Sequence, residues 1–154
     1  MKTLTTVFLA FFCFSPGFSS QEEDIDKLIL KLRHKDPEVR INAVKALEEI
    51  KTPQAVEALI SALQDEAWEV RLSATKALGK LKDSRAIDLL IHKLKDKNLN
   101  VRAGAVDALK NIEDSRVTDK LIVGLKEKHW DFRANAAAVL GLIKDPRAVE
   151  PLIA

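Results

Sequence analysis

One sequence pattern recurs four times along this chain, with a period of 31 positions. Each copy begins with Val or Phe followed by Arg, at 39–40, 70–71, 101–102 and 132–133. Apolar or small residues follow at i+4, i+7, i+8 and i+11, a spacing that places them on one side of an α-helix. A unit repeated at a fixed period buries its apolar face against its neighbours. The chain is therefore expected to form an extended array of stacked units.

Each copy is predicted to contain two helices. The first helices are expected near 37–50, 68–81, 99–112 and 130–143, and the second helices near 53–64, 84–95, 115–126 and 146–154. Asp36-Pro37 and Asp145-Pro146 both combine an N-cap residue with a proline of the first helical turn. Short turns join the helices, which makes the pairs antiparallel. We therefore predict an all-α protein, a right-handed α-solenoid of antiparallel helix pairs.

The repeat divides the chain into units 36–66, 67–97, 98–128 and 129–154, the last of them incomplete. Residues 22–34 carry the apolar pattern of a second helix and are expected to form an N-terminal cap helix. Ala154 aligns with Ser61, so the fourth unit stops inside its second helix. Repeat arrays need a polar terminal unit, and this ending favours either a truncated gene or a fragment of a longer protein.

Small residues mark where first helices are expected to meet. We call positions that occupy the same place in successive units a column. One column holds alanine in all four units: Ala43, Ala74, Ala105 and Ala136. Gly79 and Gly141 share another column. Glycine inside a helix costs about 1 kcal/mol relative to alanine, so we predict close helix crossings at both glycines.

The four segments DPEVRINAVKALEEI, EAWEVRLSATKALGKL, NLNVRAGAVDALKNI and HWDFRANAAAVLGLI resemble the HEAT-like repeats named after the phycobilisome lyases. The resemblance covers roughly residues 24–154. It implies the α-solenoid fold, whereas enzymes, chaperone-like factors and scaffolds all share such repeats.

Residues 1–19 lie outside the repeat and are predicted to be a signal peptide. Lys2 precedes an apolar run from Leu4 to Phe14, which is too short to span a bilayer, and small residues allow cleavage after Ser19. The protein is therefore expected to be exported, either periplasmic or secreted. Cys13 is the only cysteine and would be lost with the signal, which excludes disulfides and thiolate chemistry from the mature chain.

Loss of Lys2 with the signal would leave 24 basic and 23 acidic residues in the mature chain, a net charge of +1. This balance excludes a strong electrostatic attraction to nucleic acid or to an anionic membrane. No membrane span is expected after signal cleavage. We expect either a monomer or a part of a larger array.

Two arginine columns are candidates for charged sites. Arg40, Arg71, Arg102 and Arg133 are interpreted as structural residues that tie each first helix to a neighbouring turn, with a ladder for an acidic ligand as the alternative. Arg85, Arg116 and Arg147 lie at the start of second helices and could form an anion-binding edge. We expect them instead to pair with Asp88, Asp119 and Glu150, three positions later. The run 93–97 is interpreted as a solvated helix end.

Trp68 and Trp130 share a column at the N-termini of first helices. They could pack locally over a loop between units, or they could anchor a partner, because tryptophan is enriched in binding hot spots. Together with Arg85, Arg116 and Arg147 they are the candidate binding residues.

No catalytic constellation is visible. The three histidines share no column and none precedes a glutamate, whereas the hydroxylases built on this repeat use His-Glu pairs. We therefore predict no metal and no cofactor. The expected function is non-enzymatic binding of a protein or peptide by an exported scaffold. The alternatives are an enzyme-related member of the family, similar to the bilin lyases or the deoxyhypusine hydroxylases, and a spacer in a larger exported protein.

Overall fold

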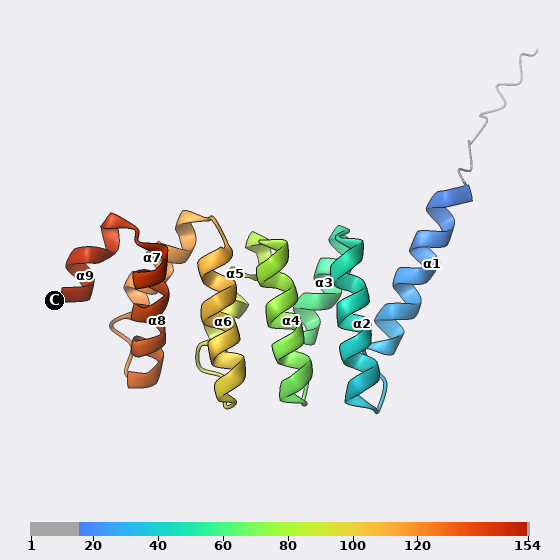
Figure 1. Cartoon of the computed structure of the whole chain (residues 1–154), viewed down its shortest axis with the longest axis horizontal. Coiled ribbons are helices and arrows are strands. Elements are labelled where there is room, and N and C mark those ends of the chain that lie inside the picture. Colours follow the sequence, from blue (N-terminus) through green and yellow to red (C-terminus); the bar gives the residue numbers. More distant parts are fainter. Residues whose placement is uncertain (1–15, 154) are drawn as a thin grey trace, which may run out of the picture.

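The computed structural model describes residues 16–153, with side chains described from Asp24 onward. The described part is helical, with short turns (Figure 1). The first helices of the four units are α2 (Pro37–Ile50), α4 (Trp68–Leu81), α6 (Leu99–Asn111) and α8 (Trp130–Ile143). The second helices are α3 (Pro53–Ala62), α5 (Ile87–Lys93), α7 (Ser115–Gly124) and α9 (Val149–Ile153). Short 3₁₀ turns, η1 (Ser84–Ala86) and η2 (Pro146–Ala148), precede α5 and α9, and α1 (Pro16–Lys31) precedes the first unit.

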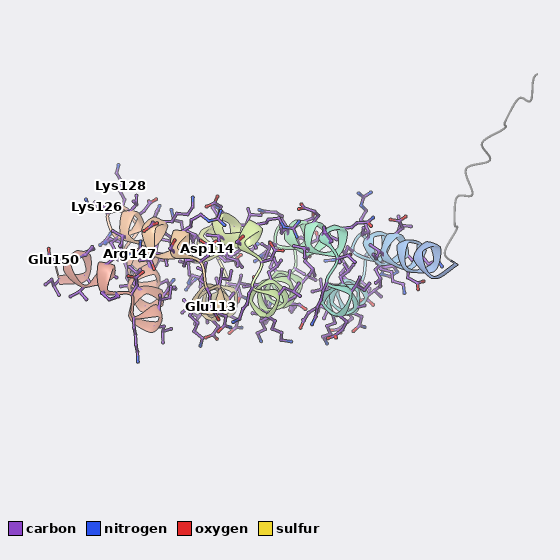
Figure 2. The ribbon with its side chains drawn as sticks, turned by 90° about the horizontal axis from the view of Figure 1, so that it is seen from above. Glu113, Asp114, Lys126, Lys128, Arg147 and Glu150 are labelled. Atoms are coloured by element: carbon purple, nitrogen blue, oxygen red, sulfur yellow. The ribbon has the colours of Figure 1, made fainter. Side chains whose placement is uncertain are left out.

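The helices form two parallel rows. The first helices stand side by side in one row and the second helices form the other (Figures 1 and 2). The core between them is built from one leucine of each first helix and from leucines of the second helices, all fully buried: Leu47, Leu59, Leu78, Leu90, Leu109, Leu121 and Leu140. This architecture confirms the predicted all-α solenoid of helix pairs.

The cap helix is longer than predicted. α1 begins at Pro16, before the expected start at residue 22, and ends at Lys31. Ile25 of this helix is buried, and Leu28 and Ile29 pack against the core as the second-helix pattern requires. Residues 1–15, which hold most of the predicted signal peptide and Cys13, lie outside the described residues. Between residues 16 and 153 no helix combines the length and apolarity needed to cross a bilayer.

The second helices are shorter than predicted. They end at Ala62, Lys93 and Gly124 rather than two positions later, because the chain tightens there into i→i−3 hydrogen bonds such as Leu63 N to Ile60 O (3.2 Å). Helix ends commonly take this 3₁₀ form. Aspartates at 83, 114 and 145 cap the helical segments that follow the first helices of units two to four, and Thr52 caps α3.

Three first helices end in an unusual backbone conformation. Lys51, Lys82 and Lys144 follow α2, α4 and α8 with φ of 58°, 53° and 58°, the left-handed region that glycine occupies most easily. α6 instead ends one position earlier, with Ile112 in an extended conformation.

The prediction of two close helix crossings is correct for one glycine and wrong for the other. A Cβ atom on Gly79 would lie 2.6 Å from Cα of Ala108, so α4 and α6 cross closely there. Gly141 has nothing within 4 Å of the corresponding position. The reason is that Gly79 faces the first helix of the next unit, and no such helix follows α8 in the described part of the chain.

Candidate binding surface

The first arginine column is tied to the turn before its own helix. The Nη1 atoms of Arg40, Arg71, Arg102 and Arg133 donate to carbonyl oxygens six positions earlier, at 2.7, 2.8, 2.8 and 2.8 Å. Arg40 and Arg71 also bind an aspartate of the following turn: Arg71 donates through Nε and Nη2 to both oxygens of Asp96, at 2.8 and 2.9 Å. Both side chains are buried, and their aspartate hydrogen bonds raise the pKa of each arginine. These contacts leave the two buried guanidinium groups little capacity for a ligand.

The interpretation of residues 93–97 as a solvated helix end is correct for Lys95 and Lys97, which are exposed, and wrong for Lys93 and Asp96. The Asp96 side chain is 5% exposed. Burial raises the pKa of Asp96, but the hydrogen bonds from Arg71 and from the Asn98 N–H lower it by more, so the net pKa lies below the ordinary value. Lys93 is also buried, with Nζ 3.9 Å from Asp96. Burial lowers the pKa of Lys93, Asp96 raises it and Arg71 lowers it, for a net decrease. The cluster is not apparent in the sequence because Arg71 and Asp96 lie 25 positions apart, at the two ends of one unit.

The second arginine column does not pair as predicted. Arg85, Arg116 and Arg147 each bind the N-cap aspartate two positions earlier, at 83, 114 and 145, rather than the acid three positions later. Hydrogen bonds from Arg147 lower the pKa of Asp145 to about 2. The aspartate holds each cation at the N-terminus of a helix, where the helix dipole disfavours a positive charge.

Three acids of this column, which also includes Glu57, bind cations of the next unit instead. Arg85 reaches Glu57 (3.0 Å) and Arg147 reaches Asp119 (2.6 Å), each across the boundary between two units. Gln54 continues this ladder by donating to Asp26 of α1 (3.1 Å). Asp88 of the same column pairs with a lysine, Lys120, rather than with an arginine (2.8 Å). The column thus forms an edge of alternating charge that links neighbouring units.

The two tryptophans are not equivalent. Both lie at the first position of their helices, but Trp130 is 74% exposed whereas Trp68 is half-buried. Of this pair, Trp130 is therefore the better candidate for a contact with a partner.

The second-helix row has a depression that the sequence did not single out. It lies between α5 and α7, has a volume of about 270 Å³, and is lined by Ile91, His92, Val123, Phe132 and neighbouring charged residues. Val123 is 71% exposed at its edge. The same column holds Leu30 in α1, Ser61 in α3 and His92 in α5, so the sequence offered no distinct signal that Val123 marks a site.

Packing of one aromatic ring shapes this depression. Phe132 stands where the other units have valine, and a Cβ atom on Gly124 would lie 2.8 Å from its ring. Gly124 therefore makes room for Phe132. Lys95 lies over the ring, with Nζ 4.4 Å from its centroid, and pairs with Glu127 at 3.2 Å. This ion pair and that of Asp88 with Lys120 connect the α5 segment to the α7 segment beside the depression.

The residue at the Gly124 position varies between units. Ala62 in this column lines a similar depression of about 250 Å³ between α1 and α3. Lys93, also in this column, is buried. The two small residues of this column thus line open depressions between second helices, whereas the long side chain of Lys93 is buried beside Asp96.

Two further cations lie beside the depression. Lys126 and Lys128 project from the second-helix row near its C-terminal end (Figure 2), and within residues 24–153 neither forms an ion pair. A depression of about 370 Å³ adjoins Val123 and Lys126, and another of about 530 Å³ lies between Lys126 and Glu150. We call Ile91, His92, Val123, Lys126, Lys128 and Phe132 the α7 surface. It offers an apolar contact with positive charge next to it.

The histidines lie apart in the structure as they do in the sequence. His34 accepts a hydrogen bond from the Asp36 N–H (3.1 Å), His92 lines the depression, and His129 is the N-cap residue of α8. Among the side chains from Asp24 to Ile153, no three His, Cys, Asp or Glu residues gather as a metal site.

Comparison with known proteins identifies the repeat. The family model described as HEAT repeats matches residues 25–99 and 88–154. Human deoxyhypusine hydroxylase is similar in structure, with a TM-score of 0.67, 24% identity, and coverage of 82% of this chain and 46% of that chain. The complex of CpcE and CpcF of phycocyanin lyase from Nostoc gives a TM-score of 0.65 and 29% identity, covering 84% of this chain and 56% of that chain.

An engineered protein also has this fold, with a TM-score of 0.54 and 23% identity over 84% of this chain and 67% of its own. No curated protein sequence matches the chain significantly. The chain spans about half the length of the hydroxylase and lyase structures that it resembles. The two matches to the family model cover nearly all of the described residues, and the chain belongs to the HEAT-repeat family.

Proposed function

We propose that this protein is a non-enzymatic scaffold that binds a protein or peptide segment through the α7 surface, and that it acts outside the cytoplasm after export. The observation that carries the proposal is Val123, an apolar side chain exposed by 71% on the second-helix row. It lies between Ile91 and the cations Lys126 and Lys128, which have no ion pair among the described side chains. The ligand would present an apolar side chain to Val123 and Ile91, with acidic residues next to it.

The series of depressions along α7 favours a polypeptide ligand. Volumes of about 270, 370 and 530 Å³ adjoin Val123 and Lys126, which makes an extended line of open sites rather than one enclosed pocket that would surround a small molecule. A single apolar side chain fits such a space, and a peptide backbone would cross the exposed face of α7. Trp130 follows the turn 126–129 and extends the surface toward the first-helix row.

The similarity to the phycocyanin lyase structure supports a second candidate. That structure is a complex of two different chains, CpcE and CpcF. By analogy, this protein would be one component of an enzyme-related assembly, with a second protein chain as its partner. Both candidates require a protein-binding surface, and the test below examines that common requirement.

The test is a selection of peptides from a random library against the full-length chain. The α7 surface predicts enrichment of peptides that combine an aromatic or aliphatic residue with Asp or Glu. Val123→Glu should weaken their binding at least about tenfold, because it removes an apolar contact and repels acidic residues.

The matched control is Ser61→Glu, at the same position of α3, two units away. It should leave both binding and the melting temperature unchanged. Equal loss of binding in the two variants, or enrichment of peptides without acidic residues, would contradict the proposal.

A further inference from the structure

The depression between α1 and α3 matches the depression between α5 and α7 position by position. Their volumes are about 250 and 270 Å³. Residues that line them occupy the same columns, separated by two periods of the repeat: Ile29 and Ile91, Arg33 and Lys95, and Ala62 and Gly124. The array thus carries the same surface feature twice.

The depression between α1 and α3 contains a cation that is not neutralised by a neighbouring acid. At the depression between α5 and α7, Lys95 pairs with Glu127. Arg33 takes the place of Lys95 between α1 and α3, but it has no ion pair among residues 24–153. The reason is that Asp65, which takes the place of Glu127, accepts from Arg40 with both oxygens at 2.8 Å. Arg33 is therefore available to an acidic ligand.

An exposed apolar residue marks one column at both places. Leu30, next to Ile29 on α1, is 66% exposed and shares its column with Val123. Ser61 and His92 of this column are exposed too, although α3 and α5 each lie between two neighbouring helices. The exposure of Leu30 therefore follows from the outward orientation of its column rather than from its place near the start of the array. Apolar contact next to an unpaired cation is the chemistry of the α7 surface as well.

Polar side chains lie between the two depressions. Ser61, Gln64 and His92 are exposed there, and Lys93 is buried beside Asp96. Exposed side chains of this kind can bind the N–H and C=O groups of an extended backbone, which has no internal partners for them, whereas a helix satisfies its own. Neighbouring helices pack about 8–10 Å apart, so two units span about 16–20 Å, the length of about five or six residues of extended chain.

We infer that the two depressions bind one extended polypeptide segment that carries two motifs, each an apolar residue next to an acidic one. The inference rests on the proposed function of the α7 surface and specifies its ligand. One motif would place its apolar side chain against Val123 and its acid at Lys126. The other would place its apolar side chain against Ile29 and its acid at Arg33. The depression between α1 and α3 has no aromatic ring in its lining, so a peptide with one motif occupies the α7 surface first.

Synthetic peptides test the inference on the full chain. A peptide selected on the chain and trimmed to one motif is compared with peptides that hold two copies of this motif at several spacings. A spacing of about five or six residues should bind at least about tenfold tighter than the single motif, because the short linker gives the second motif a high effective concentration. A peptide of the same length with a scrambled second motif is the control and should show no such gain.

Variants of the protein locate the second contact. Arg33→Glu should bring the two-motif peptide to within about twofold of the single motif, the statistical gain of a doubled motif, and leave binding of the single motif unchanged. Ser61→Glu, in the lining of the same depression, should have the same effect. Lys45→Glu makes the same change of charge at an exposed position of α2, in the first-helix row, and should preserve the full gain. Hydrogen exchange should show protection of residues 26–34 and 58–65 with the two-motif peptide only.

The outcomes separate this inference from the proposed function. A two-motif peptide that gains no more than about twofold at any spacing, or a gain that survives both Arg33→Glu and Ser61→Glu, would overturn the inference and leave the α7 surface as the binding site. Single-motif binding that Val123→Glu does not weaken would refute the proposed function instead. Protection confined to 26–34 and 58–65 would assign the ligand to the depression between α1 and α3 alone, against both proposals.

Discussion

At the residue scale, members of one arginine column differ in what they bind. Arg71 holds a buried carboxylate with two hydrogen bonds, and Arg102 in the same column holds only backbone carbonyls among the described residues. Arg71→Ala should therefore lower the free energy of unfolding by about 3–5 kcal/mol, because it leaves Asp96 buried without its partner. Arg102→Ala should cost about 1 kcal/mol. Urea denaturation of both variants measures the difference, and equal costs would show that Asp96 does not contribute.

Lys93 makes a prediction about pH. Its pKa in the folded protein is lowered, chiefly by burial, from the ordinary 10.5. Between the two values the unfolded chain binds more protons than the folded one, so the contribution of Lys93 to stability rises as pH rises through this window. The Lys93→Met variant lacks that rise. Its free energy of unfolding should exceed that of the natural protein most at neutral pH, and this difference should shrink as the pH approaches the ordinary lysine pKa. A difference in unfolding free energy that is independent of pH would contradict this account.

Sequence reasoning found the arginine columns but not their carboxylate partners. A column repeats with the period of the units and is visible in the sequence. The contact of Arg71 with Asp96 instead joins two columns of one unit, and that of Arg147 with Asp119 joins two units, so both depend on how the helices pack. The burial of Lys93 escaped detection for the same reason. The α7 surface brings together side chains of α5, α7 and α8, and its members share no column of the repeat.

At the element scale, the ends of the first helices contain strain that can be tested. Lys51 has a φ of 58°. This conformation costs an L-residue about 1–2 kcal/mol relative to the right-handed helical one. Lys51→Gly should therefore raise the free energy of unfolding. The net gain should be about 0.5–1 kcal/mol, because the entropy that glycine adds to the unfolded chain offsets part of the relieved strain. Glu113 in the same column has no positive φ, so Glu113→Gly should be destabilising. Thermal denaturation of the pair checks this, and stabilisation by both changes would count against the strain.

The elements themselves were well predicted from the sequence. Three of the four first helices have the predicted bounds, and α6 ends one position early. Their capping residues, prolines and apolar spacing all act locally. The second helices of the first three units end two positions early in tightened turns, and 3₁₀ turns replace the α-helical starts expected at 84–86 and 146–148.

At the scale of the whole molecule, the predicted export fixes the residue at which the mature protein should begin. The short apolar run between Lys2 and Ser15 should direct secretion, with cleavage after Ser19. Cleavage there would leave a shortened α1 that still contains Ile25, its buried contact with the core. Intact-mass spectrometry of the secreted or periplasmic product should show a chain that begins at Ser20. Full-length protein confined to the cytosol would contradict the prediction.

The most direct test of the binding function is a map of where a selected peptide protects the protein. Hydrogen exchange of the full chain with and without the peptide should show added protection in 88–95 and 115–132, the segments that form the α7 surface. The arginine-bearing starts of α2 and α4 should be unchanged, because their guanidinium groups already bind the protein itself. Protection confined to residues 39–71, with none on α7, would contradict the account and place the binding site along the arginines.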